Sequence, residues 1–325
     1  MKIAIVGGGW VGCHLAMKLK ADHEITIFEK NKLLFSETSF SNQNRLHQGY
    51  HYSRNYKTRK LCEDTFDLFM KDYGEFTDTI YNNYYCIPEN SVIDFRTYQQ
   101  IFDHLENGQV DNPSELKNIE GSLWVAERYI KFYELQAIFN LQLASLVEHK
   151  EIKNLKTLAK DYDLVINATN NCLNQVKNTF YEMALTLVYE KTKKTTYDAI
   201  TLVDGPFFSI YPYRDNCFSL TDVEYTPVAV LKTAKEVKSF KVDEEEIQNR
   251  IILMEEKVLK YYPKFKNDFN YLGFYISIKS KVNSASADRS PVMTKQDNIV
   301  NCFSGKIQGI YLIEDYIKEV IATDD

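Results

Sequence analysis

A glycine-rich turn near the N-terminus constrains this chain more than any other feature. The apolar run Lys2 to Val6 leads into Gly7-Gly8-Gly9-Trp10-Val11-Gly12, which fits the pattern G-x-G-x-x-G. From Trp10 to about Lys20 the apolar residues have the spacing of a helix, and His23 to Phe28 is predicted to be a second strand that ends at Glu29. The sequence therefore predicts a β-α-β unit that binds a dinucleotide.

Each residue type in this unit suits a separate task in dinucleotide binding. Gly7 permits the tight turn, Gly9 lets the backbone approach a pyrophosphate, and Gly12 lets helix and strand pack closely. The free N–H groups at the start of the helix face the phosphates. Glu29 can accept hydrogen bonds from the ribose hydroxyls, and its charge disfavours the 2′-phosphate of NADP.

The spacing of the following elements favours FAD over NAD. An NAD-binding domain of this type continues with strands and helices at short intervals. Here the next buried strand, Asp163 to Ala168, comes only after a long interruption. We therefore predict FAD as the cofactor and keep a plain NAD-dependent dehydrogenase as an alternative.

Composition narrows the classes of partner. The net charge of the 325 residues is -6, which gives no basic surface for nucleic acid. The six cysteines lie far apart, with no spacing that suits zinc, and indicate a reducing compartment. The sequence has no segment like a signal peptide or a membrane helix. We expect a cytoplasmic protein with a small-molecule substrate and with no metal, nucleic acid or membrane partner; homo-oligomerisation stays open.

Hydrophobic periodicity gives a coarse map of the rest of the chain. Residues 35–60 are polar and aromatic with no clear period, which indicates a functional loop. Helices are expected at 61–72, 95–105, 128–147, 242–262 and 307–321, and strands at 79–87, 271–279 and 299–303. Between 181 and 226, β-type runs alternate with turn signals, which indicates an antiparallel sheet and hence a second domain.

These elements predict an α/β fold with two interleaved domains. A Rossmann-type FAD-binding domain is expected to comprise residues 1–78, 130–180 and 285–325. An α+β substrate-binding domain, built on the antiparallel sheet, is expected to comprise 79–129 and 181–284.

Four segments carry a family resemblance. They are the β-α-β unit with Glu29, the segment Ser41 to Tyr52, the strand Asp163 to Thr169, and Asp288-Arg289-Ser290-Pro291 followed by Phe303 to Lys306. Together they make the chain resemble the D-amino acid oxidase (DAO) superfamily of FAD-dependent oxidoreductases, which has a glutathione-reductase-type Rossmann fold. Two departures from the family pattern are Asn170 in place of a glycine and Ser290 between the arginine and the proline.

The resemblance implies a set of site residues. Substrate contacts or catalytic roles are expected for Arg45, His47, Tyr213 and Arg289. Cofactor contacts are expected for Gly7, Gly9, Trp10, Val11, Gly12, Glu29, Lys30, Asn44, Arg45, Val147, Ala168, Thr169, Gly305, Lys306 and Ile307. Arg289 is the expected clamp for a substrate carboxylate, since a guanidinium makes two parallel hydrogen bonds to one anion.

The predicted function is that of an FAD-dependent oxidase or dehydrogenase. It would take a hydride from a C–N or C–O carbon of a small anionic substrate, such as an amino acid, an amino sugar or a nucleotide-linked sugar. The basic and aromatic residues between Arg45 and Arg59 suit such a ligand. Two alternatives keep FAD: a non-oxidative sugar mutase similar to UDP-galactopyranose mutase, and a flavin-binding module without turnover.

Overall fold

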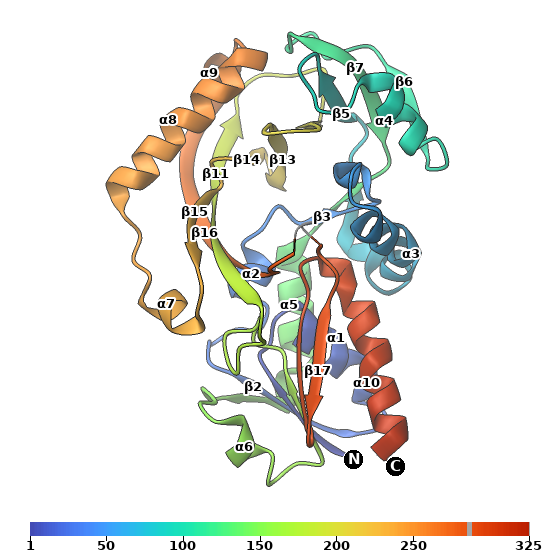
Figure 1. Ribbon diagram of the computed structural model, residues 1–325, viewed down its shortest axis with the longest axis vertical. Coiled ribbons are helices and arrows are strands. Elements are labelled where there is room, and N and C mark those ends of the chain that lie inside the picture. Colours follow the sequence, from blue (N-terminus) through green and yellow to red (C-terminus); the bar gives the residue numbers. More distant parts are fainter. Residues whose placement is uncertain (285–287, 325) are drawn as a thin grey trace.

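The part of the chain that the structure describes folds around β-sheets of six, nine and three strands (Figure 1). The computed structural model describes residues 1–284 and 288–324. The predicted boundary at residue 285 falls on 285–287, which lie outside the described residues, as does residue 325. The division into two domains therefore stays a prediction, although the α/β class is confirmed by the sheets and helices described below.

The six-stranded sheet contains the predicted β-α-β unit. Strand β1 pairs in parallel with β2 on one side and with β10 on the other, and helix α1 joins β1 to β2. The order is β17-β18-β10-β1-β2-β9, in which only β17 is antiparallel to its neighbour among the described strands. The bounds are β1 Lys2–Val6, α1 Trp10–Leu19, β2 Glu24–Glu29, β9 Val147–His149, β10 Leu164–Asn167, β17 Val292–Gln296 and β18 Ile299–Phe303.

Helices cover both faces of this sheet. Ile3 and Ile5 pack on one face against α1, α5 (Phe132–Gln142) and α10 (Ile310–Asp324). Ala4 and Val6 point to the other face, where Leu155 of α6 (Leu155–Leu158) contributes to a smaller core. Because both faces are buried, the strands are continuously apolar rather than alternating.

The nine-stranded sheet is largely antiparallel, as the runs between 181 and 226 predict. Its order is β15-β11-β14-β13-β12-β5-β7-β6, and β16 pairs with β11 along its length. The β12–β5 pair is parallel. The bounds are β5 Asn83–Pro88, β6 Asn107–Val110, β7 Ile119–Val125, β11 Thr179–Lys191, β12 Ala199–Leu202, β13 Phe208–Arg214, β14 Cys217–Asp222, β15 Pro227–Leu231 and β16 Phe269–Val282.

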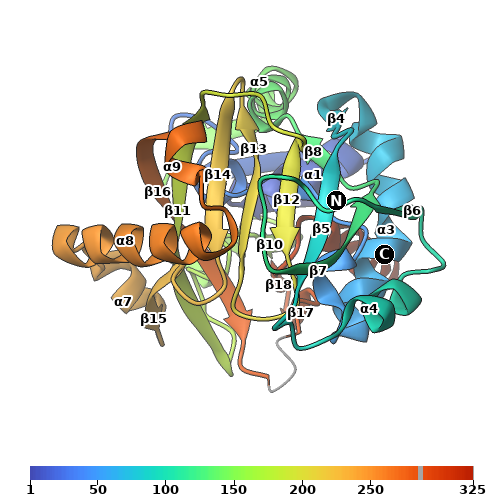
Figure 2. The same cartoon turned by 90° about the horizontal axis from the view of Figure 1, so that it is seen from above.

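Helix α8 (Glu244–Tyr261) lies across the outer face of this sheet (Figure 2). Ile247, Met254 and Val258 pack there against Leu185 and Leu187 of β11. The short helices α7 (Ala234–Ser239) and α9 (Phe265–Asp268) flank it. Because successive residues of a strand alternate in direction, the neighbouring side chains of β11 point to the opposite face, toward the six-stranded sheet.

A small sheet and several short elements join these parts. Strand β8 (Arg128–Ile130) pairs with β3 (Arg45–Leu46) and β4 (Thr77–Thr79). Around it lie α2 Glu37–Phe40, α3 Tyr56–Tyr73, α4 Phe95–Ile101 and the 3-10 turns Tyr50–Tyr52, Gly74–Phe76, Ala144–Leu146 and Ile307–Gly309. No helix within the described residues is long and apolar enough to cross a membrane.

Two predictions about these elements were wrong. The long helix at 128–147 is instead β8, α5 and β9, because Arg128–Ile130 pairs with two strands that are distant in sequence. The helix predicted to begin at 61 begins at Tyr56, where the Asn55 side chain accepts a hydrogen bond from the Thr58 amide; the region before it contains the short elements α2 and β3 between irregular segments. Long-range pairing and a cap residue decide these positions, and neither is visible in periodicity.

Candidate functional site

The glycine turn after β1 has the close packing that its sequence predicts. Gly7 has a φ of +104°, which favours glycine, and a Cβ there would lie 2.8 Å from the Ala168 carbonyl oxygen. A Cβ on Gly12 would lie 1.9 Å from the carbonyl oxygen of Gly7. The turn therefore brings β1, β10 and the start of α1 closer together than larger residues would allow.

Glu29 closes the other side of this turn. Its carboxylate accepts hydrogen bonds from the backbone N–H of Gly8 and of Asn31, both at 2.8 Å. A Cβ on Gly8 would lie 2.3 Å from Cδ2 of the buried Leu34, so this side chain would have to move to admit a larger residue. Glu29 is buried yet borders the cavity described below, where its remaining lone pairs can accept from a ribose.

The start of α1 is open toward the same cavity. Gly9 is the N-cap residue, no side chain caps the helix, and its first turn contains no acidic residue. A Cβ on Gly9 would approach Oγ of Ser39 at 2.8 Å, and this hydroxyl accepts a hydrogen bond from the Trp10 amide. A helix N-terminus with this opening is suited to a pyrophosphate. These residues therefore fit the adenosine diphosphate part of FAD.

The end of β10 forms the opposite wall. The backbone N–H of Ala168 donates to the Val6 carbonyl, and the chain then turns through Asn170, whose φ is +52°. The asparagine thus takes the left-handed conformation that a glycine would adopt easily. The departure from the family pattern at this position leaves the turn intact.

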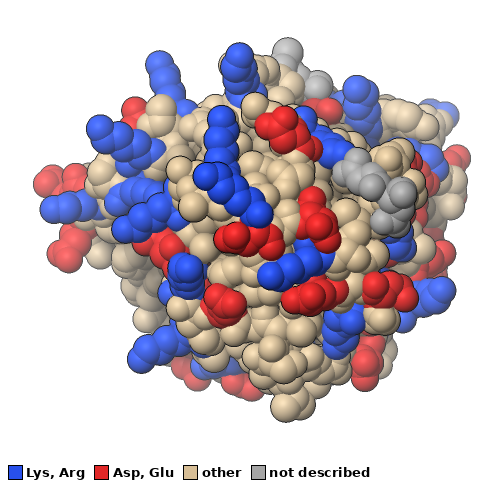
Figure 3. All heavy atoms as spheres, turned by 90° about the horizontal axis from the view of Figure 1, so that it is seen from below, with Lys and Arg blue, Asp and Glu red and all other residues tan. Residues whose placement is uncertain are grey.

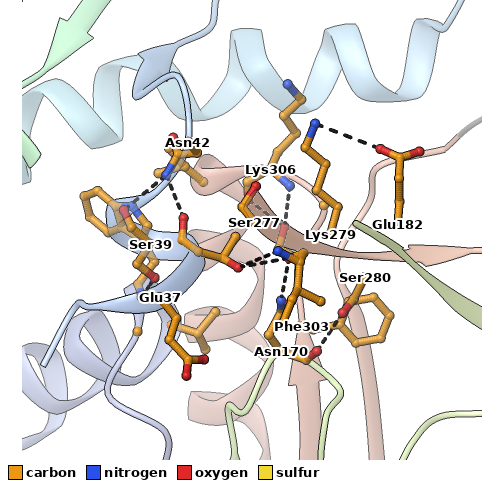
Figure 4. A pocket seen from close by; sticks show the side chains of 18 of the residues that line it. Glu37, Ser39, Asn42, Asn170, Glu182, Ser277, Lys279, Ser280, Phe303 and Lys306 are labelled. Atoms are coloured by element: carbon orange, nitrogen blue, oxygen red, sulfur yellow. Dashed lines mark hydrogen bonds and ion pairs between the residues drawn. The ribbon is translucent and has the colours of Figure 1, made fainter. Parts of the chain in front are cut away.

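One large cavity joins these elements to the nine-stranded sheet. Its volume is about 710 Å³, within the range of cofactor sites. Figure 4 shows part of its lining, from Ser39 and Asn42 to Lys279 and Lys306. The predicted site residues that line it are Gly7, Gly9, Trp10, Val11, Glu29, Lys30, Asn44, Arg45, His47, Ala168, Thr169, Arg289, Gly305, Lys306 and Ile307.

Three predicted site residues are not among the residues that line the cavity. Gly12 packs beneath the turn, and Val147 lies on β9, where it pairs with Ile27. Tyr213 stacks on Tyr275, with ring centroids 5.5 Å apart. Direct contact between Tyr213 and a ligand in this cavity therefore has no support in the structure.

Arg45 is held in place by three hydroxyl groups. Its guanidinium donates to Tyr85 at 2.8 Å, to Thr201 at 2.9 Å and to Ser209 at 2.5 Å. It also lies over the ring of Tyr211. Because most of its donors are already used and only 4% of its surface is exposed, Arg45 has little capacity left for a ligand.

Glu127, which no sequence pattern indicated, connects Arg45 to His47. Its Oε2 accepts from the Tyr85 hydroxyl at 2.7 Å, and its Oε1 lies 3.2 Å from Nδ1 of His47. The carboxylate is buried, but His47 and Arg45 lower its pKa to about 2 against the effect of burial. Burial, and then the charge of Lys306, lower the pKa of His47 to about 4.

Cationic side chains gather at this end of the cavity. Arg289 and Lys306 line it, and the Lys306 ammonium lies 4.5 Å from the ring centroid of Tyr52. Burial lowers the pKa of Lys306 to about 8. Lys279 and Lys281 extend from β16 and share the carboxylate of Glu182, as Figure 4 shows for Lys279.

Some of the lining residues could have been found from the sequence, and others could not. The run Ile276 to Val282 alternates like a strand, which places Lys279 and Lys281 on one face. Glu127 has no such signal, because its partners lie far away in the chain.

On the outer face shown in Figure 3, lysines and arginines are interspersed with acidic residues.

Comparisons with known proteins agree with this geometry. Residues 2–85 match the family model DAO, FAD dependent oxidoreductase. The chain is 31% identical to the FAD-dependent monooxygenase FPY4 of Fusarium mangiferae, over 98% of this chain and 90% of that protein. This relative covers nearly the whole chain, including the segments outside the family model.

Solved structures show the same fold at low sequence identity. Glycine oxidase from Geobacillus kaustophilus superposes with a TM-score of 0.74 at 11% identity and covers 100% of this chain and 95% of that one. L-alpha-glycerophosphate oxidase from Mycoplasma pneumoniae, solved with FAD bound, gives 0.70 at 13% identity, with 97% and 92% covered. The cofactor of this chain is FAD, and the predicted Rossmann-type fold and enzymatic function are confirmed. The chain belongs to the DAO family of FAD-dependent oxidoreductases.

Proposed function

We propose that this enzyme oxidises a C–N or C–O carbon of a small anionic substrate, bound between Arg289 and Lys306. One observation carries the proposal: neither cation has an ion-pair partner among the described residues, although both line the cavity. Both side chains are partly buried, so their charges are incompletely solvated. An anion that enters the cavity would pair with them, and amino acids, amino sugars and nucleotide-linked sugars all remain candidate substrates.

The cofactor would lie between the glycine turn and this cationic end. Bound FAD supplies the two-electron acceptor of the reaction. We assign the pyrophosphate to the α1 N-terminus and the ribose to Glu29, since both border the cavity at one end. We assign Thr169, Gly305 and Ile307 to the flavin part, since they line the same cavity.

The residues of the cationic end would divide the remaining tasks. Arg289 would orient the substrate anion, since its guanidinium is free among the described residues and can form two parallel hydrogen bonds. Arg45 would act as a positioning residue through Tyr85 and Glu127, because its own donors are largely occupied. The surrounding protein would exclude water from the reacting carbon.

The test is anaerobic reduction of the bound flavin by amino and hydroxy anions. In the Arg289→Met variant, catalytic efficiency should fall. The expected fall corresponds to a loss of about 2–5 kcal/mol in transition-state stabilisation, the cost of removing one partner of a charged pair. Arg214→Met is the matched control, because Arg214 is exposed and pairs with Asp215 outside the cavity. Equal efficiency in both variants would refute the anion clamp.

A second candidate activity is monooxygenation, which is favoured by the name of the relative FPY4. A monooxygenase would be reduced by a separate donor, such as a reduced nicotinamide, and would place oxygen in its product. Bleaching of the flavin by the substrate alone, without such a donor, would exclude it. The relatives named above give no support to the sugar mutase or to the module without turnover.

We also propose a cytoplasmic location and a small-molecule substrate. All six cysteines are free, and several are buried, which suits a reducing compartment. Separation of the cytoplasm from other fractions of the native cells would test the location.

A further inference from the structure

We propose that Glu127 holds His47 as a proton acceptor for a substrate hydroxyl, so that the enzyme oxidises a hydroxyl-bearing anion rather than an amine. This inference rests on the proposed function and narrows its substrate class. His47 would be the catalytic base, and Glu127 the residue that positions it.

Hydrogen bonding fixes which nitrogen of His47 carries its proton. Oε1 of Glu127 already accepts from the Gln48 amide at 3.0 Å, and Oε2 accepts from the Tyr85 hydroxyl at 2.7 Å. Although burial opposes ionisation, His47 and Arg45 lower the pKa of Glu127 to about 2, so the carboxylate is ionised and can only accept. The contact at 3.2 Å requires that Nδ1 of His47 be the donor.

The opposite nitrogen is then left with a free lone pair. Nε2 of His47 has no hydrogen-bond partner within residues 1–284 and 288–324, and His47 lines the cavity. Gln308 donates to the His47 carbonyl at 2.7 Å and so fixes the backbone at this point. The geometry thus presents an acceptor to a ligand.

The charge state suits this role. Burial lowers the pKa of His47 to about 4; the charge of Lys306 adds to this effect, and Glu127 opposes it. The imidazole is neutral at neutral pH and can accept a proton throughout that range. A histidine that was already protonated could not serve as a base.

A base at this place matches the demands of alcohol oxidation. The O–H bond breaks and its proton passes to Nε2 of His47, while the neighbouring C–H bond breaks and its hydrogen leaves with the electron pair as hydride. The oxidised flavin, which the activity of the family supplies, is the two-electron oxidant, and the carbon–oxygen bond becomes a carbonyl. Glu127 stabilises the imidazolium that forms, which then releases the proton to water.

Amine oxidation makes less use of this arrangement. A neutral amine expels hydride with its own lone pair, so no base is needed in that step. An ammonium substrate would be repelled by Arg289, Lys306 and Arg45.

The tautomer can be measured without turnover. Nitrogen-15 NMR of the FAD-bound enzyme, with the His47 signals identified by their loss in His47→Asn, should show a protonated Nδ1 and an unprotonated Nε2. In Glu127→Ala this preference should weaken. A protonated Nε2 in the wild-type enzyme would overturn the inference.

Kinetics test the role of the free nitrogen. In His47→Asn, reduction by a hydroxy anion should slow by about 10²–10⁴-fold, the range of general-base catalysis, with FAD occupancy retained. His104→Asn is the matched control: His104 also contacts a carboxylate, Glu63 at 3.2 Å, but on an exposed surface outside the cavity. Added imidazole should partly restore a His47→Ala enzyme, and an equal loss in both asparagine variants would refute the base.

The rates of flavin reduction by pairs of anions that differ only in a hydroxyl or an amino group show whether this inference or the proposed function has failed. Faster reduction by the hydroxy member of each pair is the expected result. Faster reduction by the amino member would overturn the inference and leave the proposed function standing. If no anion of either kind reduced the flavin, the proposed function itself would fail, whatever the tautomer.

Discussion

Replacing Gly12 by alanine should damage both the fold and FAD binding. The added Cβ would lie 1.9 Å from the carbonyl oxygen and 3.0 Å from the carbonyl carbon of Gly7, and both are backbone atoms that cannot rotate away. Contacts between heavy atoms are normally about 3.5–4.0 Å, so the start of α1 must move by about 1 Å or more. That movement would displace the N–H groups assigned to the pyrophosphate.

The magnitude follows from two opposing effects. Overpacking in a close-packed region typically costs about 1–3 kcal/mol, while alanine in a helix recovers roughly 1 kcal/mol relative to glycine. We expect the backbone clash to exceed the gain, with a net loss of about 1–2 kcal/mol in the free energy of unfolding of the FAD-free protein. FAD affinity should fall in addition.

Urea unfolding and fluorescence titration with FAD would measure the two effects separately. Gly108→Ala is the matched control, because a Cβ at Gly108 meets nothing within 4 Å. It should change the free energy of unfolding by less than about 0.5 kcal/mol. If Gly12→Ala behaved like this control in both assays, the close approach of α1 to β1 would not be what the glycine provides.

Four further changes have defined outcomes. Glu29→Ala should weaken FAD binding by roughly 1.5–3 kcal/mol per lost charged hydrogen bond, measured by FAD titration. Arg45→Met should lower the free energy of unfolding by about 3 kcal/mol in urea, because it breaks a buried charged network. Burial lowers the pKa of Lys306 to about 8, so its positive charge is lost as pH rises through 8. Benzoate, used as a simple anionic probe, should therefore bind more weakly above that pH. The Lys306→Met variant should not show this pH dependence. Against the effect of burial, His14 lowers the pKa of Glu314 from 4.5 to about 2. The ionised Glu314 therefore stabilises the fold above pH 4.5, and this contribution is lost as pH falls toward 2. Between pH 5 and pH 3, Glu314→Gln should lose less thermal stability than the wild type.

The nucleotide-binding end of the site could be predicted because its signals are local. The glycine turn, the apolar strand before it and Glu29 lie within one short stretch, and sequence spacing alone brings them together. The structure adds Gly8, where a Cβ would meet Leu34, a contact that depends on how the following loop folds back.

The catalytic end could be predicted only in part. The basic and aromatic residues from Arg45 to Tyr52 indicate a ligand-binding segment, and four of them line the cavity: Arg45, His47, His51 and Tyr52. Its organising residue, Glu127, lies just before β8 and just outside the segment 128–147 that is predicted to be a helix. A buried carboxylate that bonds to residues far away in the chain has no local pattern, because the fold alone creates its environment.

Tyr213 was predicted to be a site residue, but it is not among the residues that line the cavity. A tyrosine on a strand of the second sheet is a plausible ligand contact by residue type, but alternation along the strand sets the direction of its ring. Here the ring packs on Tyr275 and Phe132 instead of facing the cavity. Composition identifies candidates, and the register of the strand selects among them.

Product analysis of the anaerobic reaction tests the central claim most directly. The purified enzyme with bound FAD is mixed with a hydroxy anion in the absence of oxygen, and the loss of visible flavin absorbance is compared with the amount of carbonyl product trapped by a hydrazine. The account predicts that reduced flavin and trapped carbonyl form in equal amounts, and that Arg289→Met forms both far more slowly. Flavin that stays oxidised with every anion, or reduction without a carbonyl product, would contradict it.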